Sequence, residues 1–146
     1  MDAYKKYEED CKKIREDNER LLTDFETWLI FSCLTPQTIV KHIANIDFFI
    51  NEYLLHEDAI EAIEGVHSVS MYLGDWFIKK AMWASPTSIR GNAASIKKFY
   101  TFMVTKSLVR QQVLEILVQT IKKDMPAWLA RIKLHDQEAF EMDDDI

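Results

Sequence analysis

The sequence predicts an all-α fold, and three observations lead to this prediction. Apolar residues recur at helical spacing along most of the 146-residue chain, and no segment shows the alternation typical of a half-buried strand. The chain holds only three Gly and three Pro, too few for the frequent turns of an all-β fold. In addition, two stretches fifty residues apart repeat the same helix start. We therefore expect a bundle of four long helices, with an N-terminal extension and accessory helices at the C-terminus.

The repeated helix start is the most specific local signal in the chain. Thr35-Pro36 and Ser85-Pro86 each place a hydroxyl residue before a proline, the pattern of an N-cap followed by proline at the first helical position. With an offset of 50, the following Ile, Ala, Ile and Phe positions also coincide. The two apolar stripes are Ile39, Ile43, Ile46, Ile50 and Tyr53, and Ile89, Ala93, Ile96, Tyr100 and Met103. We expect paired helices over about 36–55 and 86–106.

A first helix is predicted from Asp2 to about Ser32. Its apolar stripe advances in steps of three and four residues and contains a lone polar residue, Asn18, as in coiled coils whose register is set by a buried Asn. The stripe is short and is widened by further apolar residues. An amphipathic helix packed on its own bundle is therefore the simpler interpretation, with a self-associating coiled coil as the alternative.

The remaining elements follow from the same periodicity. Asp58 is expected to cap a short turn that runs through Ile63, and a further long helix is expected over 68–82. Separate helices are predicted over 109–123 and 124–134, because Pro126 restarts the pattern. Residues 136–146 are predicted to form a disordered acidic tail, which leaves residues 1–135 as a single domain.

Composition and motifs also limit the function classes. No apolar run approaches the roughly 18 residues of a membrane span, and no signal-peptide core follows the first residues. Cys11 and Cys33 stand outside any CxxC motif, His56-Glu57 lacks the second histidine of a zinc-protease helix, and no glycine-rich phosphate loop exists. We expect a cytoplasmic protein with no membrane contact, metal, cofactor or small-molecule substrate.

The net charge of −6 conceals a strong asymmetry. Residues 81–133 carry nine bases and two acids, whereas residues 134–146 carry six acids and no base. A cationic segment within an acidic protein is a candidate surface for a polyanion. The alternative is that these bases pair with the acidic first half of the chain, or with the Asp143-Asp144-Asp145 tail.

Two helical motifs point to a known family. The first combines Phe25-x-x-Trp28-Leu29 with Leu34-Thr35-x-x-Thr38-Ile39-x-x-His42, followed by Phe49 and Leu54. The second combines Ser85-x-x-Ser88-Ile89 with Ile96-Lys97-x-Phe99-Tyr100-x-Phe102-Met103. Over roughly residues 20–110, these motifs resemble the two hairpins of the N-terminal core-binding domain of tyrosine recombinases and phage integrases. The resemblance implies a SAM-like orthogonal bundle that, with a catalytic domain, clamps around double-stranded DNA.

The same resemblance implies a DNA-binding surface on the two helices that the hydroxyl-bearing turns open. Independently of it, helix N-termini suit phosphate oxygens, and a helical wheel places Lys41 and Lys98 opposite the apolar stripes. The alternative is that the hydroxyls only cap their helices and that the lysines form ordinary solvated surface. The residues implied as DNA-binding are Thr35, Thr38, Lys41, His42, Ser85, Ser88, Arg90, Lys97 and Lys98.

The chain departs from the family in its chemistry. Family members carry a catalytic domain with an Arg, a Lys, a His-x-x-Arg motif and a Tyr nucleophile. None of the four histidines here, His42, His56, His67 and His135, has Arg three residues later. Recombinase activity is therefore not implied, and we expect a non-catalytic domain that contacts duplex phosphates without reading sequence, as an accessory or a remnant of a mobile element. The alternative is a protein-interaction or homodimerisation module that keeps the fold without affinity for DNA.

Overall fold

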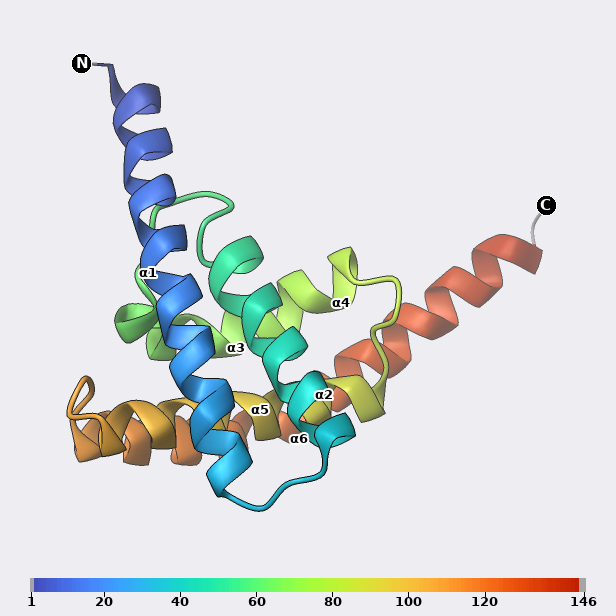
Figure 1. Cartoon of the computed structure of the whole chain (residues 1–146). Helices are drawn as coiled ribbons and strands as arrows, with labels where there is room; N and C mark the ends of the chain where they lie inside the picture. Colours follow the sequence, from blue (N-terminus) through green and yellow to red (C-terminus); the bar gives the residue numbers. More distant parts are fainter. Residues whose placement is uncertain (1, 145–146) are drawn as a thin grey trace.

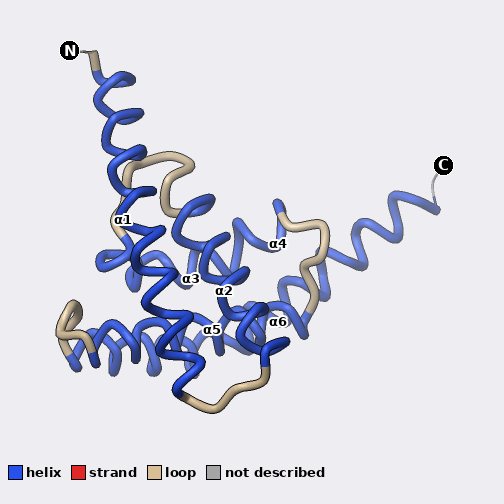
Figure 2. The backbone as a smooth tube through the Cα atoms, in the orientation of Figure 1, coloured by secondary structure: helices blue, strands red, loops and turns tan. Residues whose placement is uncertain are grey.

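The computed structural model describes residues 2–144, with side chains for residues 2–142, and every regular element in that range is helical. The predicted all-α bundle is thus confirmed (Figures 1 and 2). None of the described helices is long and apolar enough to cross a lipid bilayer. In chain order the elements are α1 (Ala3–Phe31), α2 (Pro36–Asp47), η1 (Phe48–Tyr53), η2 (Ala62–Ser68), α3 (Val69–Met71), η3 (Tyr72–Trp76), α4 (Phe77–Lys80), α5 (Pro86–Thr105) and α6 (Gln111–Asp144).

Helix α1 packs on the bundle through the stripe that the sequence predicts. Asp2 caps the first turn by accepting a hydrogen bond from Lys5 N at 2.8 Å. Asn18 is buried, and its Nδ2 donates to Asn51 Oδ1 at 2.8 Å and to Ile50 O at 3.3 Å. Because the polar residue of the stripe is satisfied within one molecule, packing on its own bundle is confirmed. The stripe is not free to form a coiled-coil seam.

Helices α2 and α5 begin as predicted. Thr35 and Ser85 have the extended backbone of an N-cap, and Pro36 and Pro86 occupy the first helical turn. Each N-cap oxygen accepts a hydrogen bond from the backbone N–H three residues later, at 3.3 Å in α2 and 3.0 Å in α5. Helix α2 continues without a break into the π-helical segment η1, so the helical unit ends close to the predicted position.

The two twin helices also share their burial pattern. Positions that are buried in both helices at an offset of 50 include Ile39 and Ile89, Ile46 and Ile96, Phe49 and Phe99, and Ile50 and Tyr100. The helices cross in Figure 1 and touch at another equivalent pair, where Asn45 Nδ2 donates to Ser95 Oγ at 3.0 Å. The sequence repeat thus corresponds to two helices that present equivalent faces to a common core.

The segment before the third helical unit differs from the prediction. The turn expected from Asp58 through Ile63 is instead the 3₁₀ helix η2, which starts after Glu61 without a side-chain cap. A tertiary contact sets this start, since Tyr100 Oη of α5 donates to Ala62 O at 2.6 Å. The helix expected over 68–82 is found as Val69–Lys80, with a π-helical segment, η3, in its middle.

Helix α6 corrects two predictions. The chain forms one continuous helix where separate helices over 109–123 and 124–134 were expected. Pro126 is exposed, so solvent can satisfy the carbonyl that loses its intrahelical bond, while Ile121 and Trp128 are buried on either side and hold both halves against the core. The disordered tail predicted over residues 136–146 differs from the structure over 136–144, and residues 145 and 146 lie outside the described residues. Helix α6 runs to Asp144, and it projects from the body with every described side chain after residue 132 exposed (Figure 1).

Candidate nucleic-acid interface

The hydroxyl groups at the two helix starts serve as caps. Thr35 Oγ1 donates to Thr38 Oγ1 at 2.9 Å in addition to accepting from Thr38 N. Ser85 and Ser88 form a reciprocal capping box, in which Ser85 N donates to Ser88 Oγ at 2.8 Å. These hydroxyls are therefore engaged in holding the helix ends, as the capping alternative expects, and those of Thr35, Ser85 and Ser88 donate to protein acceptors.

His42 lies inside the protein and is not on an outer face. Its side chain is 8% exposed, and Nδ1 lies 2.7 Å from Ser95 Oγ. Because Ser95 directs its single hydroxyl proton to Gly91 O at 3.0 Å, Nδ1 acts as the donor to Ser95. Burial, and to a lesser extent the nearby Lys98 ammonium, lowers the pKa of His42. His42 was predicted as a DNA contact; in the structure it is a buried residue that joins α2 to α5 and does not lie on the outer face of α2.

The predicted basic residues do lie at the surface. Lys41, Arg90 and Lys97 are exposed, and Lys98 is half-buried at the edge of α5 that faces α2. Ser95 marks that edge of α5, and helical spacing places Arg90 and Lys97 on the other side of the helix. The nine predicted contacts therefore separate into capping hydroxyls, one core histidine and a group of surface bases.

Helix α6 adds a basic residue that the prediction of contacts omitted. Ser70 of α3 donates to Asp124, and Arg131 lies 3.6 Å from Asp75 of η3, so one edge of α6 contacts that helical unit. Helical spacing puts Lys122 on the opposite edge, which faces α5. The sequence analysis counted Lys122 among the bases of residues 81–133. Only the contacts of α6 show on which edge of the helix it lies.

The α5–α6 hairpin is cationic and largely without internal ion pairs. Residues 86–123 carry seven bases and a single acid, Glu115. Among residues whose side chains are described, none of these seven bases forms an ion pair; of the nine bases of 81–133, only Arg131 does. Pairing with the acidic first half of the chain is thus limited to one contact, and pairing with Asp143–Asp145 concerns side chains outside the described residues.

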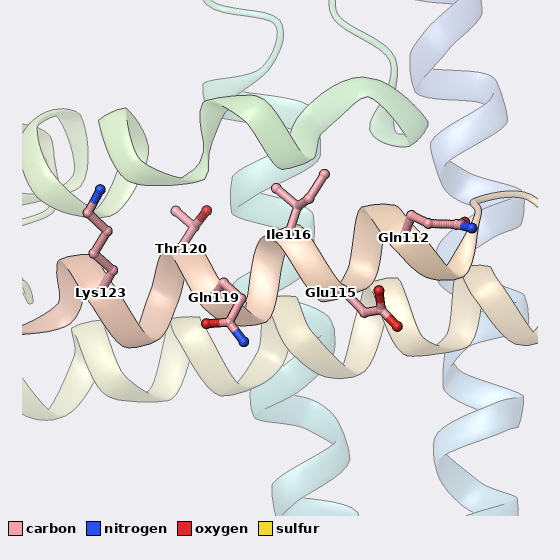
Figure 3. Close-up of a pocket in the computed structure, with 6 residues that line it drawn as sticks. All are labelled: Gln112, Glu115, Ile116, Gln119, Thr120 and Lys123. Atoms are coloured by element: carbon pink, nitrogen blue, oxygen red, sulfur yellow. The ribbon is translucent and has the colours of Figure 1, made fainter.

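A depression of about 620 Å³ on the described surface is lined by α6 alone. Figure 3 shows its side chains projecting from one helix, with Ile116 and Thr120 toward the α3 side. It contains one acid and one base, Glu115 and Lys123, and no second wall of other elements encloses it. This is an open helix surface, and its geometry does not converge reactive groups on one point.

Comparison with known proteins assigns no family to this chain. No protein-family model, curated protein or solved structure matches this chain.

Proposed function

We propose that this chain is a non-catalytic, cytoplasmic DNA-binding domain that holds duplex phosphates through the α5–α6 hairpin. The observation that carries the proposal is the density of bases in residues 86–123, seven against one acid, with no ion pair to any described side chain. Cationic groups that are not neutralised by their own protein gain most from displacing counterions at a polyanion. The twin capped helices also support kinship with the integrase core-binding domain.

The contacts we assign are narrower than the sequence implied. Arg90, Lys97 and Lys122 border the surface of α5 and α6, and Lys98 with Lys41 borders the adjoining edge of α2. A Cβ at Gly91 would have no neighbour within 4 Å, so no helix packs there and this stretch of α5 is open to a ligand backbone. Contacts of this kind give affinity and position without reading bases.

The test measures binding to a mixed-sequence DNA duplex at two salt concentrations, with fluorescence anisotropy as the readout. About five phosphate contacts predict that affinity falls roughly 500-fold between about 50 and 200 mM salt. The variant R90E/K97E/K98E should bind far more weakly than the wild type and show a shallower salt dependence.

A matched control separates local contacts from net charge. The variant K5E/K12E/K13E makes the same change of charge on exposed lysines of α1, none of which forms a described ion pair. It should retain most of the wild-type affinity. Equal losses in both variants, or no binding by the wild type at the lower salt concentration, would refute the proposed surface.

A further inference from the structure

A second surface feature lies between α1 and α2, in the acidic first half of the chain. An apolar groove of about 290 Å³ runs between α1 and α2, and we call it the α1–α2 groove. At the low end of ligand-pocket volumes, it has room for a side chain and little more. Val40 in its wall is 66% exposed. Its apolar wall consists mainly of Leu22, Val40, Ile43 and Ala44, and its charged residues are Glu26 from α1 and Asp47 from α2.

The α5–α6 turn has the complementary chemistry. It comprises residues 106–110, which we call the basic turn, and connects the two helices of the cationic hairpin. Leu108 is 48% exposed, and it stands between the exposed bases Lys106 and Arg110, neither of which forms a described ion pair. Two backbone hydrogen bonds fix the conformation of the turn, since Leu108 N donates to Met103 O at 2.9 Å and Ser107 N donates to Val104 O at 2.9 Å.

The basic turn cannot enter the groove of its own molecule. Trp28 of α1 contacts Phe102 near the end of α5, with ring centroids 6.0 Å apart. Helical spacing puts Trp28 on the flank of α1 away from Leu22 and Glu26, which line the groove. The turn that follows α5 therefore lies beside the flank opposite the groove, and the two features can meet only between molecules.

We infer that this protein associates head to tail with further copies of itself, with Leu108 of one copy inserted in the α1–α2 groove of the next. Lys106 and Arg110 then lie against Glu26 and Asp47, which pairs each base with an acid around an apolar anchor. Because the basic turn and the groove lie on opposite flanks of α1, one copy cannot present both to the same neighbour. The contact is therefore heterologous, and it continues into chains or rings rather than stopping at a two-fold dimer. The apolar anchor and its flanking charges make the association both concentration- and salt-dependent.

Sedimentation velocity across a roughly hundredfold range of protein concentration, at about 50 mM salt, tests the inference without DNA. The weight-average mass of the wild type should rise with concentration. L108E and V40E should each weaken association by roughly ten- to hundredfold, because a charge replaces the apolar contact. Both side chains are largely exposed, so folding should be kept, and circular dichroism checks it. M71E, at a methionine that is 61% exposed and lies outside both features, should associate like the wild type.

Mixing the two defective variants gives the decisive result. V40E keeps an intact basic turn and L108E keeps an intact groove, so together they should form a one-to-one complex that cannot grow further. Failure of the mixture to associate, a wild type that stays monomeric over the whole range, or equal weakening by M71E would each overturn the inference. A two-fold dimer using one patch twice would leave the mixture no better than either variant alone.

Discussion

Replacing Gly65 with alanine is expected to destabilise the bundle by about 2–6 kcal/mol. Gly65 lies in η2, and a Cβ at this position would lie 2.5 Å from Tyr100 Oη and 2.9 Å from Leu54 Cδ1. Both neighbours are buried, so neither can move into solvent. Overpacking of this kind costs about 1–3 kcal/mol. Displacing Tyr100 also breaks its 2.6 Å hydrogen bond to Ala62 O and leaves that carbonyl buried without a donor, at about 1–3 kcal/mol.

Gly91 provides a matched control on α5. A Cβ there meets nothing within 4 Å, so G91A should raise the free energy of unfolding by about 0.5–1 kcal/mol through helix propensity alone. In a domain of this size, 1 kcal/mol shifts the thermal midpoint by about 2–4 °C. Thermal and urea unfolding followed by circular dichroism should therefore move the midpoint down for G65A and up for G91A.

A double-mutant cycle locates the cause of the G65A effect. Y100F removes the hydroxyl that the new Cβ would meet, so G65A/Y100F should be less destabilised than the sum of the single variants, by about 1–2 kcal/mol. Additive effects, or a G65A variant within about 0.5 kcal/mol of the wild type, would show that η2 does not pack against Tyr100 as described.

Two further predictions concern the end of α5 and the buried histidine. Ser107 adopts a left-handed backbone with φ of 60° at the end of α5. S107G should therefore stabilise the fold by about 0.5–1 kcal/mol, measured by urea unfolding. The control S32G changes a serine with φ of −84° and should give no such gain. Because burial lowers the pKa of His42 in the folded state, the unfolded chain binds the proton first as pH falls. The free energy of unfolding should therefore decrease from pH 7 towards pH 5, mainly below the unfolded value of about 6.5, and this slope should be smaller in H42Q. An unchanged slope in H42Q would place the titrating group elsewhere.

Local signals predicted the helix starts, because a cap is made by residues that are neighbours in the chain. Thr35-Pro36 and Ser85-Pro86 carry the acceptor and the fixed φ of a helix start within two residues, and both were located correctly. Asp58 shows the limit of the same reasoning. Asp58 is of the right type to cap a helix, but the helix that follows, η2, starts at Ala62, where Tyr100 from a distant part of the sequence donates a hydrogen bond.

The position of His42 could not be predicted from one stripe. The sequence places Ile39 and Ile46 on a single apolar line, with His42 on its border. In the structure α2 is covered by α1 on one side and by α5 on the other, so its buried arc is wider than the apolar line and includes His42. The polar atoms that this burial requires come from Ser95, whose partner role is visible only when α2 and α5 are placed together. The α1–α2 groove was missed for the same reason. The signal in the sequence was Val40, an apolar residue that lies outside the stripe.

The two proposed interactions use different parts of the cationic hairpin, and this determines how they can be separated. Arg90, Lys97 and Lys98 lie along α5, whereas Lys106 and Arg110 are the first and last residues of the basic turn that follows it. Added salt weakens both interactions, so salt dependence alone cannot attribute an effect to either. V40E changes only the acidic half of the molecule and leaves every base in place. If copies join head to tail along a duplex, V40E should reduce the cooperativity of DNA binding while single-site affinity on a short duplex stays unchanged. A loss of affinity on the short duplex would instead place the α1–α2 groove within the DNA-binding surface.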